Sequence, residues 1–265
     1  MFLLSAFEMT AGREYNKRYS HKVAGGTGGG VLEGVFQRTA WLIGEDALRI
    51  LAASRVAVFG LGGVGSFCVE GLARAGVGSL LLVDRDIFEP SNLNRQLGAL
   101  ADTLGRPKAE VMAGRVGLIN PAARVDFLVA QYTPGNGGLF FQDRLDYVVD
   151  AMDDVPAKVD LIKRTLAMGV PVASSMGAGN RLDPTRFAVA DISATRVCPL
   201  ARVVRRKLRE EGIERGVKTV FSDEPPARRV DGPAPASISF VPPVAGFILA
   251  SVVVRDLIGR SPEVQ

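Results

Sequence analysis

The sequence predicts an α/β protein with a doubly wound, mostly parallel sheet, followed by a C-terminal extension. The main observation is that short apolar runs alternate with segments of helical periodicity between about residues 36 and 180. Parallel strands can be joined only by a crossover long enough to hold a helix, so this alternation indicates a parallel sheet with right-handed crossovers. A second observation is a glycine-rich turn directly after the first predicted strand.

The elements of the core follow one another closely. Apolar residues from Trp41 to Leu51 recur at helical spacing and predict a helix before the first strand. We expect strands at residues 55–59, 79–83, 125–130, 145–149 and 170–174. Helices are expected at residues 64–75, 107–119 and 155–168, and Pro107 suits the first turn of the second of these helices.

The rhythm changes after residue 180, where the extension begins. We expect a strand at residues 187–192, a basic helix at 199–211 and a final apolar helix at 244–258. Residues 224–243 hold six of the fifteen prolines, which predicts an extended segment crossing the surface. The chain therefore divides into residues 1–34, a core at 35–180, and an extension at 181–265 that packs on the core. Residues 1–34 lack apolar periodicity and are rich in glycine, so we predict a flexible leader.

Composition excludes several classes of protein. Hydrophobic residues make up 47% and charged residues 23% of the chain, which excludes an intrinsically disordered protein. The net charge is only +4, so any affinity for nucleic acid must come from a local cluster. Two cysteines, Cys68 and Cys198, cannot form a disulfide framework or a four-cysteine zinc site. We expect a cytoplasmic protein without membrane insertion, because no apolar run reaches the roughly 18 residues of a span.

The glycine-rich turn is the sharpest local signal. Its glycines are Gly60, Gly62, Gly63 and Gly65. Glycines there let the backbone approach a phosphate, whose charge is met by N–H groups at a helix amino end. Asp84 ends the next predicted strand, which completes the pattern of a Rossmann-like nucleotide site. Two ligands stay open at this point: a dinucleotide, with Asp84 on a ribose hydroxyl, or ATP.

A set of charged residues favours ATP. Attack on a phosphate builds negative charge that Arg, Lys and a metal ion must meet, whereas hydride transfer needs no such set. The chain supplies Arg95 and Lys108, and it places Asp150 and Asp153 just after a central strand, where ligand crevices lie. Either aspartate could instead cap the following helix.

These motifs together carry a family resemblance. They are Gly60 to Gly65, Asp84 with Asp86, Asn92-Leu93-Asn94-Arg95-Gln96, Lys108-Ala109-Glu110 and Asp150-Ala151-Met152-Asp153. In order and spacing they resemble the adenylation domain of the ubiquitin-activating-like superfamily, over about residues 38–179. The resemblance implies ATP and Mg²⁺ as cofactors, adenylation of a carboxylate and release of pyrophosphate, so residues 35–180 become an ATP-binding adenylation core.

The resemblance also implies roles for single residues. Arg95, Lys108 and Asp153 would be catalytic, with Asp153 positioning the metal. Asp84 would hold the ribose, and Asn92 and Arg95 would hold phosphates. The nucleotide site would further include the four glycines together with Asp86, Asn94 and Gln96. Arg38 falls where this family often places an arginine that reaches the partner subunit's ATP, which implies a homodimer.

Further segments narrow the resemblance to one branch of the superfamily. Sulfur-carrier branches usually add two CxxC pairs, which this chain lacks. Residues 38–48, 177–185, 199–201, 220–224 and 239–243 are similar to the branch that dehydrates threonylcarbamoyladenosine in tRNA. That branch adenylates the threonyl carboxylate, and the neighbouring carbamoyl group then closes a ring and expels AMP. Cys68 lies with Val69 and Leu72 on the helix after the glycine-rich turn and is expected to be buried. An intramolecular nucleophile needs no enzyme thiol, so Cys198 is not expected to be catalytic.

Alternatives remain at the level of function. The chain could adenylate a small sulfur-carrier protein, or it could be a dinucleotide-binding oxidoreductase or a silent nucleotide-binding partner. A sulfur-relay partner is a further candidate. The extension is the candidate tRNA-binding surface, because Arg202, Arg205, Arg206 and Arg209 share one face of the basic helix. The same face could simply be solvated and paired with neighbouring glutamates.

Overall fold

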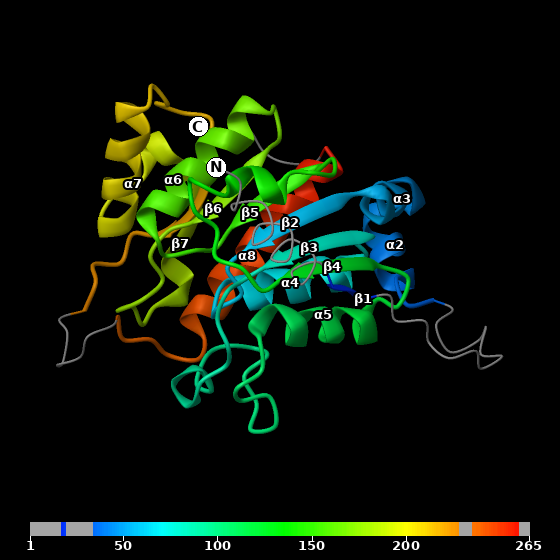
Figure 1. The fold of residues 1–265 in the computed structure, drawn as a ribbon. Helices are drawn as coiled ribbons and strands as arrows, with labels where there is room; N and C mark the ends of the chain where they lie inside the picture. The colour runs from blue at the N-terminus through cyan, green and yellow to red at the C-terminus, as the bar shows by residue number, and fades with distance from the viewer. Residues whose placement is uncertain (1–16, 20–33, 228–234, 260–265) are drawn as a thin grey trace, which may run out of the picture.

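The computed structural model describes residues 17–19, 34–227 and 235–259. Its strands form one sheet of eight within this part of the chain, in the order β1-β4-β3-β2-β5-β6-β8-β7 (Figure 1). The strands are β1 (Lys17–Tyr19), β2 (Arg55–Phe59), β3 (Ser79–Val83), β4 (Arg124–Leu128), β5 (Tyr147–Asp150), β6 (Val172–Ser175), β7 (Phe187–Asp191) and β8 (Lys218–Ser222). The strands from β4 to β8 in this order are parallel, and β1 and β7 are antiparallel at the edges. The predicted doubly wound, mostly parallel sheet is confirmed.

The strand order contains one reversal, and this reversal positions the site. From β2 the chain moves outward through β3 and β4, and then returns to place β5 on the other side of β2. Phe59 of β2 lies in register with Asp150 of β5. The carboxyl ends of these two strands therefore mark the switch point, where ligands bind in open α/β sheets.

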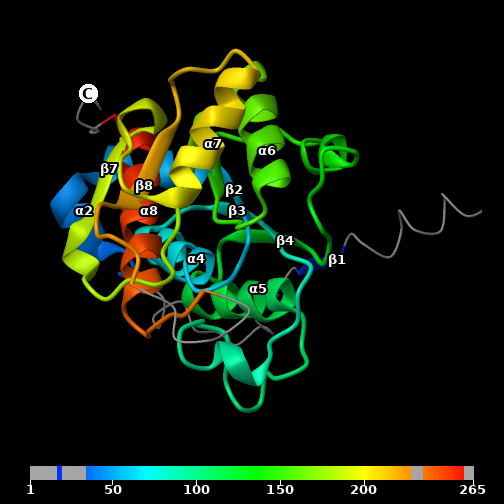
Figure 2. The same ribbon diagram turned by 90° about the vertical axis from the view of Figure 1, so that its left-hand side faces the viewer.

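Helices cover both faces of the sheet. They are α2 (Gln37–Ile43), α3 (Glu45–Ala53), α4 (Gly65–Ala75), α5 (Lys108–Ile119), α6 (Val155–Ala167), α7 (Pro199–Glu210) and α8 (Val241–Leu257). Val58 of β2 belongs to a core with α4, α5 and α8, whereas its neighbour Phe59 belongs to a core with α6 and α7. This alternation follows from the two-residue period of a strand. Figure 2 shows α6 and α7 together on one side of the sheet.

The structure corrects the sequence prediction at several places. The helix expected around residues 41–51 is two helices, because Gly44 between them has φ 91°, and Trp41 and Leu42 are exposed rather than packed. The strand β8 was not predicted, since its apolar core of two residues is too short to show a period. In the predicted leader the structure describes Lys17–Tyr19, which pair with β4 and cover its edge, and Gly34. The other residues of that prediction lie outside the described part.

The final helix begins earlier than expected. α8 starts at Val241, and Pro242 and Pro243 occupy its first turn, where a missing N–H costs nothing. The glycine Gly246 lets α8 approach α4, because a Cβ there would lie 2.3 Å from the carbonyl oxygen of Val64. None of the helices in the described residues is long and apolar enough to cross a membrane.

Candidate nucleotide-binding site

A cavity of about 1050 Å³ lies at the carboxyl ends of the central strands. Most of the residues singled out from the sequence line it: Gly60, Gly62, Gly63, Asp84, Asp86, Asn92, Arg95, Gln96, Lys108 and Asp153. The volume is at the upper end of the range of roughly 300–1,000 Å³ for small-molecule sites. The switch point of the sheet, the glycine turn and the charged residues therefore meet in one place.

The glycine turn is closed so tightly that two of its glycines cannot be replaced. Gly60 has φ 86°, and a Cβ on it would lie 2.7 Å from the carbonyl oxygen of Ala151. A Cβ on Gly65 would lie 1.8 Å from the carbonyl oxygen of Gly60. The turn leads directly into α4, whose amino end has no side-chain cap. Uncapped N–H groups at a helix amino end beside a cavity form an anion-binding site.

Asp84 is fixed at the end of β3 beside this turn. Its carboxylate accepts hydrogen bonds from the backbone N–H of Leu61 at 2.6 Å and from that of Asp86 at 2.8 Å. Burial raises the pKa of Asp84 above its ordinary value, although these hydrogen bonds and the charge of Lys108 act in the opposite direction. The carboxylate is therefore held as an oriented acceptor at the cavity wall.

Lys108 begins α5 and reaches back to the end of β3. Its Nζ lies 3.0 Å from a carboxylate oxygen of Asp86, and its backbone N–H donates to the carbonyl oxygen of Asp86 at 2.9 Å. The lysine is buried, whereas the side chain of Asp86 is 52% exposed. The cavity thus contains an ammonium group whose partner carboxylate faces solvent.

The segment from Asn92 to Gln96 forms another wall. Arg95 donates to the carbonyl oxygen of Ser91 at 2.8 Å and to the side chain of Asn94 at 2.9 Å. Asn92 is buried and accepts from the backbone N–H of Glu89 at 3.2 Å, so it stabilises the loop. Gln96 is buried, and its Oε1 has no hydrogen-bond partner within the described residues. Asn94 is not among the lining residues and donates to the carbonyl oxygen of Ser237 at 3.1 Å.

The acidic residues at the end of β5 and just after it have different environments. Asp153 is exposed, lines the cavity and forms no hydrogen bond or ion pair with any residue that the structure describes. Asp154 caps α6 by accepting from the backbone N–H of Ala157 at 2.8 Å, so the capping alternative for Asp150 and Asp153 is wrong. Asp150 is fully buried and lies 2.6 Å from Nζ of Lys158. Among the described residues no group of three or more His, Cys, Asp or Glu could hold a metal on its own.

Comparison with known proteins places the chain. The model of the ThiF family matches residues 36–265. The chain belongs to the ThiF family. It is 47% identical over 240 residues to the tRNA threonylcarbamoyladenosine dehydratase of Bacillus subtilis (strain 168), covering 84% of this chain and 94% of that protein.

Solved structures agree with this placement. The crystal structure of the Escherichia coli tRNA N6-threonylcarbamoyladenosine dehydratase TcdA in complex with ATP is similar with a TM-score of 0.81 at 35% identity, covering 87% of this chain and 96% of that one. The same E. coli enzyme in complex with AMP gives a TM-score of 0.82 at 34% identity, covering 89% and 98%. The fold of this ThiF-family chain therefore extends over nearly the whole of those enzymes.

Besides Asn94, two more residues predicted for the site lie outside the cavity lining of this ThiF-family chain. Gly65 does not line the cavity and instead packs against the carbonyl group of Gly60 within the turn. Arg38 is on the exposed helix α2, outside the cavity lining. Within one chain the structure does not bring Arg38 to the other site residues.

Sequence reasoning assigned no site residue to the wall that the end of the core and the extension form together. This wall contains Ser175 at the end of β6 and the residues up to Arg181, Cys198 to Leu200 at the start of α7, and Pro226, Pro235 and Ser237. It also missed Lys158, the partner of Asp150. A lysine on an otherwise apolar face of a helix is the one signal that could have revealed it.

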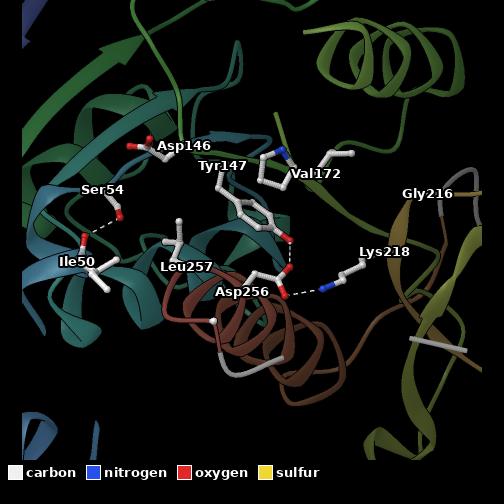
Figure 3. Close-up of a pocket in the computed structure, with 11 residues that line it drawn as sticks. Ile50, Ser54, Asp146, Tyr147, Val172, Gly216, Lys218, Asp256 and Leu257 are labelled. Atoms are coloured by element: carbon white, nitrogen blue, oxygen red, sulfur yellow. Dashed lines mark hydrogen bonds and ion pairs between the residues drawn. The ribbon is translucent and has the colours of Figure 1, made fainter. Parts of the chain in front are cut away.

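A second cavity, of about 690 Å³, lies at the amino ends of the strands, opposite the first cavity (Figure 3). The hydroxyl of Tyr147 donates to Asp256 at 2.6 Å, and Asp256 also pairs with Lys218. Burial, together with the hydrogen bond to Asp256, raises the pKa of Tyr147. These contacts tie α8 to β5 and β8 in the ThiF-family fold, so this cavity is lined by a structural network.

Proposed function

We propose that the protein is an ATP-dependent tRNA threonylcarbamoyladenosine dehydratase that activates the threonyl carboxylate as its adenylate. One observation carries this proposal: a single cavity joins an uncapped helix amino end, the cations Arg95 and Lys108, and the carboxylate of Asp153, which pairs with no described residue. This is the set of groups that a reacting triphosphate needs. The similarity to dehydratases over most of the chain supports the substrate.

In this proposal the phosphates of ATP lie over the glycine turn and the amino end of α4. Arg95 and Lys108 contact phosphate oxygens, and Asp84 accepts hydrogen bonds from the ribose hydroxyls. Asp86 holds Lys108 in place before the nucleotide arrives. Gln96 lines the same cavity, and its Oε1, which has no partner among the described residues, can accept a hydrogen bond from the nucleotide. The side chain of Asn92 holds its own loop by accepting from Glu89, and the side chain of Asn94 holds the chain at Ser237.

Asp153 is the residue that would hold Mg²⁺. A single carboxylate fits this ion, because Mg²⁺ in nucleotide sites is usually bound by one or two carboxylates, phosphate oxygens and water. The exposed position of Asp153 at the cavity leaves its oxygens available for this purpose. When bound, the ion would neutralise negative charge on the phosphates.

The chemistry then proceeds in two steps. A threonyl carboxylate oxygen attacks the α-phosphorus, and the bond to pyrophosphate breaks while Lys108 and Arg95 stabilise the added charge. The carbamoyl group of the same nucleoside next attacks the activated carbonyl carbon, and the bond to AMP breaks. Proximity within one molecule supplies the second nucleophile, so no enzyme thiol is required. Both thiols are buried, and the proposal includes no sulfur transfer through this chain.

The exposed face of α7 is the proposed contact with tRNA. Arg202, Arg206 and Arg209 are exposed along the helix, whose first residues line the cavity. Arg205 is different, because its Nη1 donates to the carbonyl oxygen of Thr195 at 2.7 Å and is committed to the fold. Of the four arginines grouped by helical spacing, Arg205 is therefore excluded from the proposed phosphate contacts.

A homodimer completes the proposal. Arg38 is exposed on α2 and lies outside its own chain's cavity, next to Trp41 and Leu42, whose exposed fractions are 74% and 81%. Large exposed apolar side chains mark interaction surfaces, and a second copy would cover them while receiving Arg38. We include cytoplasmic location in the proposal, because the acceptor is tRNA.

The deciding experiment supplies ATP, Mg²⁺ and tRNA that carries threonylcarbamoyladenosine, and follows AMP and pyrophosphate. We expect AMP release that depends on the modified tRNA. Matched reactions contain either unmodified tRNA or a sulfur-carrier protein. Pyrophosphate exchange that depends on the carrier, tightly bound NAD, or no AMP with modified tRNA would each overturn the proposal.

A further inference from the structure

We propose that Arg181 and the amino end of α7 form an anion subsite in the cavity wall opposite the proposed phosphate contacts. This subsite holds the carboxylate that is to be activated. The inference rests on the proposed function and adds to it a binding residue to which the sequence analysis gives no role, although Arg181 lies within the similar segment 177–185.

Arg181 is a buried cation with a donor to spare. The residue is 5% exposed and lines the cavity. Its Nε donates to the carbonyl oxygen of Gly177 at 3.2 Å, whereas its Nη1 is buried and has no hydrogen-bond partner among the described residues. Burying a charged group without a partner is unfavourable, so such groups are retained where a ligand completes them. The missing partner of a guanidinium is an oxyanion, which it can bind through two parallel hydrogen bonds.

The amino end of α7 lies against the same spot. A Cβ on Gly177 would be 3.5 Å from Sγ of Cys198 and 3.7 Å from Cβ of Leu200, so the glycine that accepts from Arg181 touches the start of α7. This 12-residue helix has no side-chain cap, and Cys198, Pro199 and Leu200 line the cavity. Its amino end therefore adds positive potential and unsatisfied N–H groups beside the guanidinium.

The backbone before α7 is held in an unusual conformation. Val197 has φ 62°, and the backbone N–H of Cys198 donates to the carbonyl oxygen of Arg196 at 2.6 Å. Positive φ is rare for a β-branched residue and costs conformational energy. This turn fixes the direction in which α7 starts, and so directs its amino end towards Gly177.

The cover over the subsite selects the kind of anion. Asn180 exchanges hydrogen bonds with Ala236 at 2.7 and 2.8 Å, and its carbonyl oxygen accepts from the backbone N–H of Ala227 at 2.7 Å. Pro226 and Pro235 from this covering segment line the cavity. A carboxylate at the end of a side chain can reach a cation buried to this degree, whereas a backbone phosphate of RNA carries a ribose on each side.

Charge balance gives the same answer. The acceptor carboxylate has to approach a triphosphate, and two anions repel each other more strongly in a cavity than in water. Arg95 and Lys108 are on the proposed phosphate side. Arg181 is contributed by the segment after β6 and provides a separate cation for the second anion. The cavity then pairs each anion with its own positive group.

The test compares Arg181→Met and Arg181→Lys with a control, Arg144→Met, in the full-length protein. The side chain of Arg144 is 90% exposed, and the residue precedes β5 at the opposite edge of the sheet. We expect Arg181→Met to lower kcat/KM for modified tRNA by roughly 10- to 100-fold, the effect of losing a hydrogen-bonded charge. The affinity for ATP should stay unchanged, Arg181→Lys should recover part of the loss, and the control should match the wild type.

Two further measurements keep the inference falsifiable. The Tm of Arg181→Met should be equal to or higher than that of the wild type, because the substitution removes a buried charge that lacks a partner among the described residues. A clearly lower Tm would mean that Arg181 is structural. Binding of unmodified tRNA should be unchanged, and its loss would reassign the subsite to a backbone phosphate. A failure of the proposed function would show in the wild type alone, as no AMP with modified tRNA. The subsite is overturned when Arg181→Met and Arg144→Met bind modified tRNA equally well.

Discussion

Removing the buried charge of Lys158 is a direct test of how the floor of the cavity is built. Lys158 and Asp150 are both fully buried, with Nζ 2.6 Å from a carboxylate oxygen. The same Nζ donates to Oγ of Ser174 at 3.2 Å and to the carbonyl oxygen of Ser175 at 2.9 Å. Ser174 also donates to Asp150 at 2.6 Å. One lysine thus joins α6 to the ends of β5 and β6.

The magnitude follows from this geometry. Lys158→Met keeps a similar volume but leaves the carboxylate of Asp150 without its counter-charge, which costs about 3–5 kcal/mol for a fully buried pair. A domain is stable by only about 5–15 kcal/mol, so this loss is large. At roughly 2–4 °C for each kcal/mol in a protein of this size, we expect a fall in Tm of about 6–20 °C.

The matched control removes both charges. In Asp150→Asn with Lys158→Met no buried ion is left unpaired, and we expect most of the stability to return. Circular dichroism during thermal and urea unfolding measures both variants. Asp150 also accepts from the backbone N–H of Met152 at 3.2 Å, next to Asp153, and asparagine keeps this acceptor oxygen, so the stable double variant should need about the same Mg²⁺ concentration as the wild type for half-maximal AMP release. A single variant as stable as the wild type, or a double variant no better than the single, would refute this reasoning.

Other perturbations probe the nucleotide, the dimer and the tRNA. Lys108→Ala should lower AMP formation by about 10²- to 10³-fold in a steady-state assay while the unfolding midpoint stays within a few degrees; near-normal turnover would count against its role. Mixing Arg38→Ala with Lys108→Ala chains should restore about a quarter of the wild-type rate, because half of the dimers are mixed and each contains one complete site; no recovery would exclude action across the dimer. Burial raises the pKa of Asp84, so ATP affinity measured by calorimetry should start to fall at a higher pH than for an ordinary aspartate as the pH is lowered, and Asp84→Asn should abolish this dependence. Arg206→Gln should reduce the slope of log affinity for tRNA against log salt by about one, whereas Arg205→Gln should lower stability instead.

Local patterns account for the parts of the molecule that the sequence predicted well. The run 55–59 and the glycines after it specify a buried strand and a tight turn within a few residues, and the predicted and observed strand agree. The break at Gly44 was missed because apolar spacing continues across it, and only the backbone conformation separates α2 from α3.

Contacts between distant segments account for what could not be predicted. Lys158 and Asp150 become a pair only once α6 packs on β5, and Asp150 looks like a metal ligand or a helix cap when judged by its position in the sequence. Arg181 lies in the similar segment 177–185, but the sequence does not mark it as a binding residue, because its significance lies in the absence of a hydrogen-bond partner for its Nη1 among the described residues. The motifs identified one side of the cavity, and the side formed by the extension emerged only from the fold.

The two lysines of the site show how burial of the partner separates a structural charge from one that can serve a ligand. Asp150 is fully buried with Lys158, so moving that lysine would leave a carboxylate in the interior. Asp86 is 52% exposed, so water can solvate its carboxylate when a phosphate oxygen replaces it as the partner of Lys108. Lys108 can therefore turn from Asp86 to a phosphate oxygen at little cost. Because Lys108 is the first residue of α5, its ammonium group stays in the cavity whether it contacts Asp86 or a phosphate oxygen. Lys108 is therefore the better candidate for the lysine that stabilises negative charge on the reacting phosphate.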